Sequence, residues 1–241
     1  MIFEIYQDSI GYIIKDKKIL NLGIISILSF LIIPIIILAG YSYRTTEISL
    51  ESMVNLNKKK PSFKNIKELL SQGIKVIIVT LIYSIPLFIA AYLLSSIDFI
   101  IRIVETSGMS TIEFNLEFIG ILAIISFISF LFISVAIPIM INNNGSLKSA
   151  FKIKEIIKII KNVEVINYLK FIILLIITFI GILILIFLVG QILINLIAIT
   201  GFLIPGHAVI LFYIAIGMFF VIPAYILCES RAIGLIYNMG S

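Results

Sequence analysis

The chain has 241 residues, of which 61% are hydrophobic and 13% are charged, and its formal net charge at pH 7 is +5. Soluble proteins contain about 45–50% apolar and about 25% charged residues, so this chain has too few charges to keep its apolar residues covered in water. A single Cys, a single His and no Trp argue against a disulfide scaffold and a Cys/His metal site. The composition therefore indicates an integral membrane protein.

Residues 1–18 are predicted to form an amphipathic N-terminal helix, because their polar side chains gather on one arc of a helical wheel. These polar residues are Glu4, Gln7, Asp8, Gly11 and Lys15. Glu4 and Asp8 stand where a signal peptide would have a basic region, so the segment is not expected to be one.

The segment Ile19–Tyr43, between Lys18 and Arg44, has no charged residue and is long enough to cross a membrane. It also has Pro34 near its middle, where proline removes a backbone donor and kinks a helix. Two interpretations stay open: a single kinked span, or a re-entrant hairpin that enters and leaves on the same side.

Residues 44–75 form a basic segment that ends in a predicted amphipathic helix. Pro61 and Ser62 supply a helix start with Ser as the N-cap. The helix then continues directly into the next apolar span at Val76. Its candidate contacts with lipid or a partner are Lys64, Lys67 and Lys75.

Two further charge-free stretches, Val76–Ile97 and Phe118–Leu147, are each predicted to cross the membrane once. The connection Asp98–Glu117 contains four carboxylates and Arg102. Its acidic residues lack the spacing of a calcium-binding loop, so we expect a solvated acidic loop.

Residues 142–170 form the second basic segment, with an amphipathic helix predicted over Ser149–Asn162. Its expected apolar face consists of Ile153, Ile156, Ile157 and Ile160. The candidate contacts with lipid or a partner on its polar face are Lys154, Lys158 and Lys161.

The longest charge-free stretch, Phe171–Cys228, is predicted to contain two spans, near residues 171–196 and 207–228, separated by a Gly/Pro-rich turn at residues 201–206. Gln191 and Asn195 are four residues apart and share one helix face, so they form a candidate intramembrane polar face. No charged residue falls within any of these predicted spans, which disfavours an ion-coupled carrier.

The distribution of the 18 Lys and Arg residues predicts the orientation, because basic residues collect in cytoplasmic loops. With a hairpin at Ile19–Tyr43, all of them except Arg102 lie on one side. With a full span there, Lys15, Lys17 and Lys18 move to the other side. Both arrangements place the first and third loops in the cytoplasm of a multi-pass cell-membrane protein and leave the side of the N-terminus open.

No catalytic constellation is expected. His207 and Cys228, the sole His and Cys, would stand about 30 Å apart at opposite ends of a helix. The sequence also contains no phosphate-binding loop and no paired metal-ligand motif. We therefore expect no enzyme activity, no cofactor, no metal and no nucleic-acid partner.

Several short motifs together resemble an uncharacterised, largely archaeal family of prokaryotic membrane proteins, domain of unknown function 4013. They are Leu38-Ala39-Gly40-Tyr41-Ser42-Tyr43-Arg44, the stretch from Pro61 to Lys75, the stretch from Gly145 to Lys152, and Arg231-Ala232-Ile233-Gly234-Leu235-Ile236-Tyr237. The resemblance implies a multi-pass helical membrane domain, and it implies no activity and no catalytic residues.

The predicted fold is thus all-α: one polytopic helical domain over residues 1–241, with five to six hydrophobic helices and amphipathic interfacial helices. The leading functional hypothesis is a non-enzymatic protein that organises anionic inner-leaflet lipid, or a cytosolic or membrane protein partner, through the Lys-rich helices. The alternative is a permease or carrier component for a small neutral or lipid-like solute, with the polar face of Gln191 and Asn195 lining its path.

Overall fold

The computed structural model describes residues 2–14, 18–52, 54, 60–95, 101–106, 109–114, 116–199 and 206–241. In chain order the elements are α1 (Ile2–Ile14), α2 (Ile19–Ile27), the 3₁₀ turn η1 (Leu28–Phe30), α3 (Ile32–Leu50), α4 (Ile66–Ser95), β1 (Ile101–Thr106), β2 (Met109–Phe114), α5 (Leu116–Asn142), α6 (Leu147–Ala150), α7 (Ile153–Asn162), α8 (Val165–Ile199), α9 (Gly206–Ile216), the π-helix η2 (Gly217–Val221) and α10 (Ile222–Gly240).

The protein is a polytopic helical membrane protein, as its composition predicts. Within the described ranges, four helices are long and apolar enough to cross a membrane: Ile66–Leu93, Ile119–Asn142, Val165–Ile192 and Leu211–Gly240. These four correspond to four of the five predicted apolar segments. Residues 201–205 of the predicted turn lie outside the described part of the chain, between α8 and α9.

The last long helix continues well beyond the predicted end at Cys228. It runs from α9 through η2 and α10 to Gly240, so Glu229 and Arg231 both lie on it. The predicted span up to Cys228 has no charged residue, but the helix that contains it has Glu229 and Arg231 beyond that point. The apolar pattern resumes after Arg231, and an internal ion pair described below lets the helix keep that arginine in the interior.

The segment Ile19–Tyr43 folds as a hairpin. The chain reverses at Leu31, where the backbone becomes extended between η1 and α3. Leu22 on α2 and Leu38 on α3 consequently pack in one cluster. The side chains at the two ends of the segment also reach the same stretch: the Lys18 ammonium donates to the carbonyl of Pro61, and Arg44 donates to the carbonyl of Ser62. The two ends thus lie on one side, as in the hairpin interpretation.

α4 begins later than predicted and by a different local structure. The Ser62 hydroxyl accepts a hydrogen bond from the backbone N–H of Lys64 at 3.1 Å, and Asn65 follows in the left-handed region with φ 57°. The helix starts only at Ile66. From there it passes Val76 without interruption, as predicted, so the start of α4 and its apolar part form one continuous helix.

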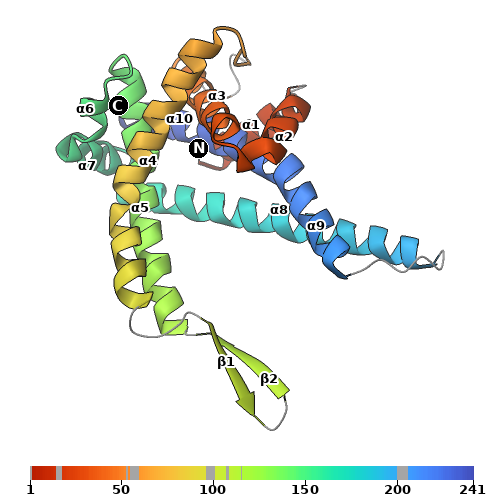
Figure 1. The fold of residues 1–241 in the computed structure, drawn as a ribbon. Helices are drawn as coiled ribbons and strands as arrows, with labels where there is room; N and C mark the ends of the chain where they lie inside the picture. The colour runs from red at the N-terminus through yellow and green to blue at the C-terminus, as the bar shows by residue number, and fades with distance from the viewer. Residues whose placement is uncertain are drawn as a thin grey trace.

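The connection predicted as a solvated acidic loop contains a β-hairpin. β1 and β2 pair antiparallel, with Ile101 opposite Phe114 and Thr106 opposite Met109. The β-branched residues of Ile101–Thr106 favour a strand. The fold is therefore helical apart from this two-stranded ribbon, which extends from the α4–α5 pair in Figure 1.

α3 and α4 cross at two glycines. A Cβ added at Gly73 would lie 2.0 Å from the carbonyl oxygen of Ile36 and 2.9 Å from the backbone nitrogen of Gly40. A Cβ added at Gly40 would lie 2.2 Å from the carbonyl oxygen of Leu69. The two backbones can approach this closely only because neither glycine has a side chain.

The helices meet in one region, from which two long pairs project (Figure 1). α10 packs on both α1 and α3 there, while α4 with α5 and α8 with α9 extend away from it. The main core joins α4, α5, α7, α8 and α10. Its buried residues include Val79, Ile139, Met140, Ile156, Phe171, Ile172 and Leu235. A smaller cluster of Leu22, Leu38, Tyr41 and Leu227 holds the hairpin against α10.

Candidate functional site

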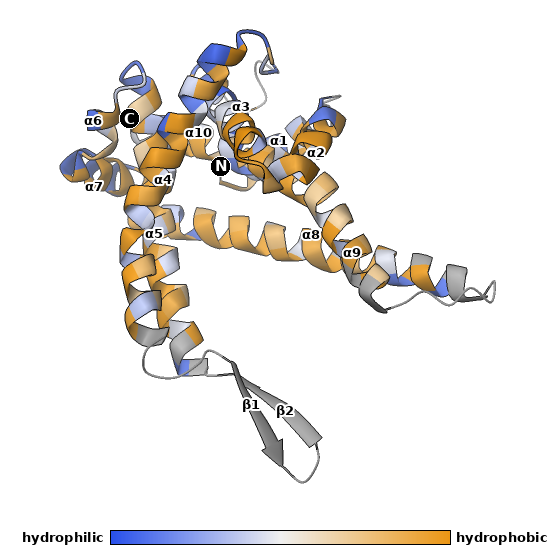
Figure 2. Ribbon diagram, in the orientation of Figure 1, coloured by the Kyte–Doolittle hydropathy of each residue, from blue (hydrophilic) through white to orange (hydrophobic). Residues whose placement is uncertain are grey.

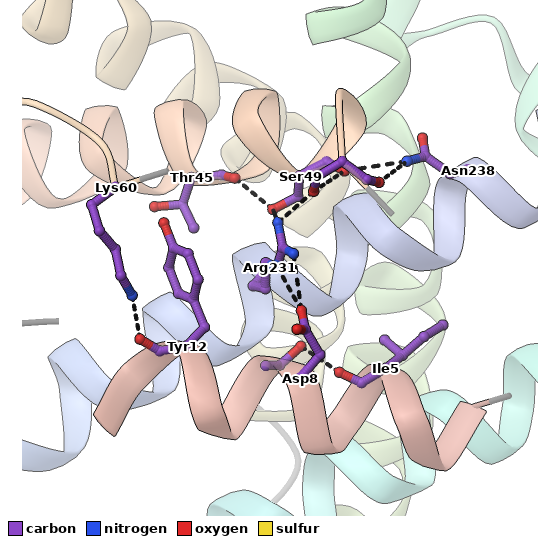
Figure 3. A network of polar contacts seen from close by, with 10 residues as sticks. Ile5, Asp8, Tyr12, Thr45, Ser49, Lys60, Arg231 and Asn238 are labelled. Carbon is purple, nitrogen blue, oxygen red and sulfur yellow. Dashed lines mark hydrogen bonds and ion pairs between the residues drawn. The ribbon is translucent and has the colours of Figure 1, made fainter. Parts of the chain in front are cut away.

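A buried ion pair joins the two ends of the chain (Figure 3). Nε of Arg231 on α10 donates to Oδ2 of Asp8 on α1 at 3.0 Å, and Nη2 lies 2.9 Å from the same oxygen. The two side chains are only 1% and 3% exposed. The Asp8 carboxylate therefore faces the interior, whereas the sequence places it on the polar arc of the N-terminal helix.

The same guanidinium also contacts residues at the end of α3. Nη1 of Arg231 lies 2.5 Å from the Ser52 hydroxyl and 3.5 Å from that of Ser49. About two helical turns further along α10, the Asn238 amide donates to the carbonyls of Ser49 and Leu50 at 3.2 and 3.1 Å. These bonds satisfy carbonyls that the end of a helix leaves open. The network positions α1, α3 and α10 and is structural.

α7 presents a mixed apolar and basic face to the outside. Ile156 and Ile159 are 0% and 5% exposed and pack into the main core. Ile153 and Ile157 are 54% and 41% exposed, although the sequence predicts them on the same apolar face as Ile156. Ile159, which is absent from the predicted face, takes that inner position.

The three predicted lysines of α7 lie beside these exposed isoleucines. At 100° per residue, Lys161, Lys154 and Lys158 follow Ile157 around the helix, and all three are exposed. Within the described part of the chain, the ion pair found on this helix is the one between Lys152 and Glu155 at 3.4 Å. The charges of Lys154, Lys158 and Lys161 are therefore not neutralised by described acidic side chains.

The predicted lysines of α4 divide into two groups. Lys64 and Lys67 are exposed near the helix start, whereas Lys75 is partly buried. A Cβ on Gly145 would lie 2.8 Å from Nζ of Lys75 and 2.9 Å from the Tyr43 hydroxyl oxygen, so Lys75 is held between α3 and the turn after α5. Only Lys64 and Lys67 are placed for contact with an external surface.

Polar and apolar residues separate along the molecule. Figure 2 shows hydrophilic residues gathered around α6, α7 and the start of α4, and hydrophobic residues along α5, α8 and most of α4. The basic lysines thus lie at one end of the apolar α4–α5 pair. Such a distribution is typical of the boundary between a membrane interior and the aqueous phase.

A cavity of about 450 Å³ lies between α3, α4, α5 and α10. Its wall is mainly aliphatic, with hydroxyl groups from Ser42, Thr46 and Thr80. Glu229 of α10 is the one ionisable residue among those that line it. A carboxylate in an apolar cavity can recognise a positively charged group, because few other groups there compete for it.

The predicted polar face of α8 is partly used within the protein. The Tyr213 hydroxyl of α9 donates to Oε1 of Gln191 at 2.9 Å, and its ring lies next to Gly190. Asn195 is exposed. Neither Gln191 nor Asn195 lines the Glu229 cavity, so a solute path along this face stays a prediction. Among the described residues, no group of three or more His, Cys, Asp or Glu could hold a metal ion.

A protein-family model described as "Protein of unknown function (DUF4013)" matches residues 25–194, well over half of the chain. The chain belongs to the DUF4013 family. No curated protein and no solved structure matches it. The matched range begins near the end of α2, includes the α3–α4 glycine crossing and α7, and ends within α8, before α9 and α10. The resemblance found in the sequence motifs is thus confirmed at the level of the family.

In this DUF4013 member, the sequence reasoning missed Asp8, Glu229 and Arg231 as interior charged residues. A signal for them exists, because an apolar helical pattern runs on past Glu229 and Arg231 to Tyr237. Charged residues on such a helix face the protein interior or a cavity and are functional candidates. The predicted span ends at Cys228, before the first charged residue, and therefore leaves both residues out.

Proposed function

We propose that the protein is a non-enzymatic membrane protein that gathers anionic lipid at one membrane surface through the exposed face of α7. The observation that supports this most directly is the adjacency of exposed Ile153 and Ile157 to exposed Lys154, Lys158 and Lys161. An interfacial helix places apolar side chains among the acyl chains and lysines at the headgroups. α7 offers both on its outward side.

The burial of α7 gives this face a fixed orientation. Ile156, Ile159 and Val163 anchor the helix in the core shared with α5, α8 and α10. A helix that is already folded and oriented does not have to order itself on contact with lipid, so less of the interaction energy is lost. Lys64 and Lys67, at the same hydrophilic end of the molecule, would extend the basic surface.

The orientation proposed for this surface is cytoplasmic. All the Lys and Arg residues except Arg102 can lie on one side once Ile19–Tyr43 is a hairpin. The contacts of Lys18 and Arg44 with the Pro61–Lys64 stretch support that arrangement. The inner leaflet of a cell membrane is the surface on which such lysines would meet anionic lipid.

The test is the local enrichment of anionic lipid around the full-length protein. The protein is reconstituted in vesicles of phosphatidylcholine with a minor fraction of spin-labelled phosphatidylglycerol, and the motionally restricted fraction is measured. We expect salt-sensitive enrichment, because each lysine near the surface contributes about 1 kcal/mol. The triple change Lys154→Gln, Lys158→Gln and Lys161→Gln should weaken the interaction on the order of a hundredfold.

The matched control changes the same three lysines to Arg, which keeps the charge and should keep the enrichment. Equal restriction of phosphatidylcholine and phosphatidylglycerol by the wild-type protein would overturn the proposal. So would unchanged enrichment in the glutamine variant. Either result would leave the lysines as candidates for a protein partner, to be identified by salt-sensitive co-purification.

A further inference from the structure

The second feature of interest is the Glu229 carboxylate, which is partly buried on α10 and faces the cavity between α3, α4, α5 and α10. Among the described residues, no hydrogen bond or ion pair with its side chain is found. A carboxylate in an apolar surrounding is costly unless it is matched by a positive charge or hydrogen-bond donors. The cavity therefore holds a carboxyl group that no described side chain pairs with, and a positively charged ligand would stabilise its ionised form.

The nearest arginine along the helix does not supply that partner. The Arg231 guanidinium binds Asp8, Ser49 and Ser52 on the other side of α10. The hydroxyls near Glu229 are also engaged within the protein. Ser42 and Ser230 lie 2.7 Å apart, and Ser230 donates to the carbonyl of Ile226 at 2.6 Å.

The lining selects the chemical class of ligand. No Lys, Arg or His is among the lining residues, so the phosphate of a lipid would meet no positive side chain. A single carboxylate without further acidic ligands is also a poor site for a divalent metal ion, which prefers several oxygens. A compound with one ammonium group and an apolar body matches both the charge and the aliphatic wall. The volume of about 450 Å³ is within the usual range of small-molecule sites.

We propose that this cavity binds a hydrophobic monocation, an alkylammonium ion, whose head pairs with Glu229. The chain of the ligand packs along the aliphatic side chains of α3, α4 and α5, among them Ala39, Val76 and Ile133. This site is separate from the lipid-binding face of α7, because none of the α7 residues lines the cavity. The proposal therefore stands independently of the proposed function.

The experiment uses the full-length protein in phosphatidylcholine nanodiscs and n-octylammonium as the probe. Saturable binding is measured by competition and by the shift in unfolding temperature, with n-octanol and octanoate as probes of equal chain length. We expect n-octylammonium to bind about tenfold or more tightly than n-octanol, because a charge-assisted contact is added. The isosteric change Glu229→Gln should remove that preference.

Two further variants serve as controls, one outside the cavity and one that fills it. Glu155→Gln removes a carboxylate on α7, outside the cavity, and should leave the preference unchanged. Thr80→Phe fills the cavity while it keeps Glu229, and should weaken all three probes. Equal binding of n-octylammonium and n-octanol by the wild-type protein would overturn the proposal whether or not the variants fold. A preference that persists in Glu229→Gln would overturn it as well.

Discussion

Asp8 and Arg231 are 223 residues apart in the sequence, and the Arg231 guanidinium donates a 3.0 Å hydrogen bond to the Asp8 carboxylate in the interior of the protein. The pair fastens the first helix to the last one and brings the guanidinium to the end of α3 (Figure 3). Because both side chains are almost completely buried, neither charge can be removed alone without leaving the other unmatched.

The first prediction concerns this pair. Asp8→Leu or Arg231→Met should each destabilise the protein by about 3–5 kcal/mol, because each leaves a buried charge without its partner. The double change Asp8→Leu with Arg231→Met should recover most of that loss, since a well-packed apolar pair can replace a buried ion pair. The measurement is the unfolding transition of the full-length protein in detergent, followed by circular dichroism. A double variant as unstable as the sum of the two single variants would show that the residues are not coupled.

The non-local character of this pair explains why the sequence could not reveal it. A helical wheel compares only residues on one helix, and by that measure Asp8 belongs with Glu4 and Gln7 on a polar arc. Its burial depends on Arg231, which lies near the other end of the sequence. The same limit applies to Glu229, because the cavity that it lines is formed together with residues of other helices.

Local patterns did predict much of the fold. The charge-free stretches predicted the four long helices, and the basic residues at both ends of Ile19–Tyr43 were compatible with the observed hairpin. The β-hairpin was not predicted, although Ile101–Thr106 is rich in β-branched residues, because the connection was interpreted from its acidic residues alone. The lysines of α7 were predicted to be exposed, and they are. Two of the five isoleucines of α7 are buried: Ile156, which belongs to the predicted apolar face, and Ile159, which does not.

The second prediction concerns the crossing of α3 and α4. Gly73→Leu should separate the helices, because even a Cβ at this position would lie 2.0 Å from the carbonyl oxygen of Ile36. We expect a large loss of stability or no folded protein, measured by the monodisperse yield in detergent and by the unfolding temperature. Gly120→Leu is the matched control, because a Cβ there meets nothing within 4 Å. Comparable yields of the two variants would contradict the close crossing.

The third prediction concerns Glu47, near the end of α3. Burial raises the pKa of this carboxyl above its usual value, and the nearby Glu51 and Glu68 carboxylates raise it further, against the opposing effect of Arg44. A raised folded-state pKa means that ionisation weakens the fold. The contribution of Glu47 to stability is therefore complete below its unfolded-state pKa of 4.5 and is lost as the pH rises through the folded-state value.

Glu47→Gln should accordingly raise the unfolding temperature at pH 7 and have little effect near pH 4. The measurement is the difference in unfolding temperature between variant and wild type over pH 4–8. Glu164→Gln, an exposed residue before α8, serves as the control and should show no such trend. A difference that grows as the pH falls would reverse the expected sign and refute the explanation by burial.

The last prediction separates the two components of the α7 face. Ile153→Ser with Ile157→Ser should leave the fold intact, because both side chains point outward, but should reduce the insertion of α7 into the interface. Removing the apolar contacts should lower the anionic-lipid enrichment even at low salt, whereas removing the lysines should abolish its salt dependence.

The readout is the bilayer depth of a spin label at residue 158, measured by collision with a lipid-soluble and a water-soluble relaxant. The lysine at that position is replaced by Cys for labelling, and Cys228 is buried. Ile156 is buried in the main core, so Ile156→Ser should instead lower the unfolding temperature. An unchanged depth in the double serine variant would mean that α7 stands away from the bilayer and that its lysines meet a partner in the aqueous phase.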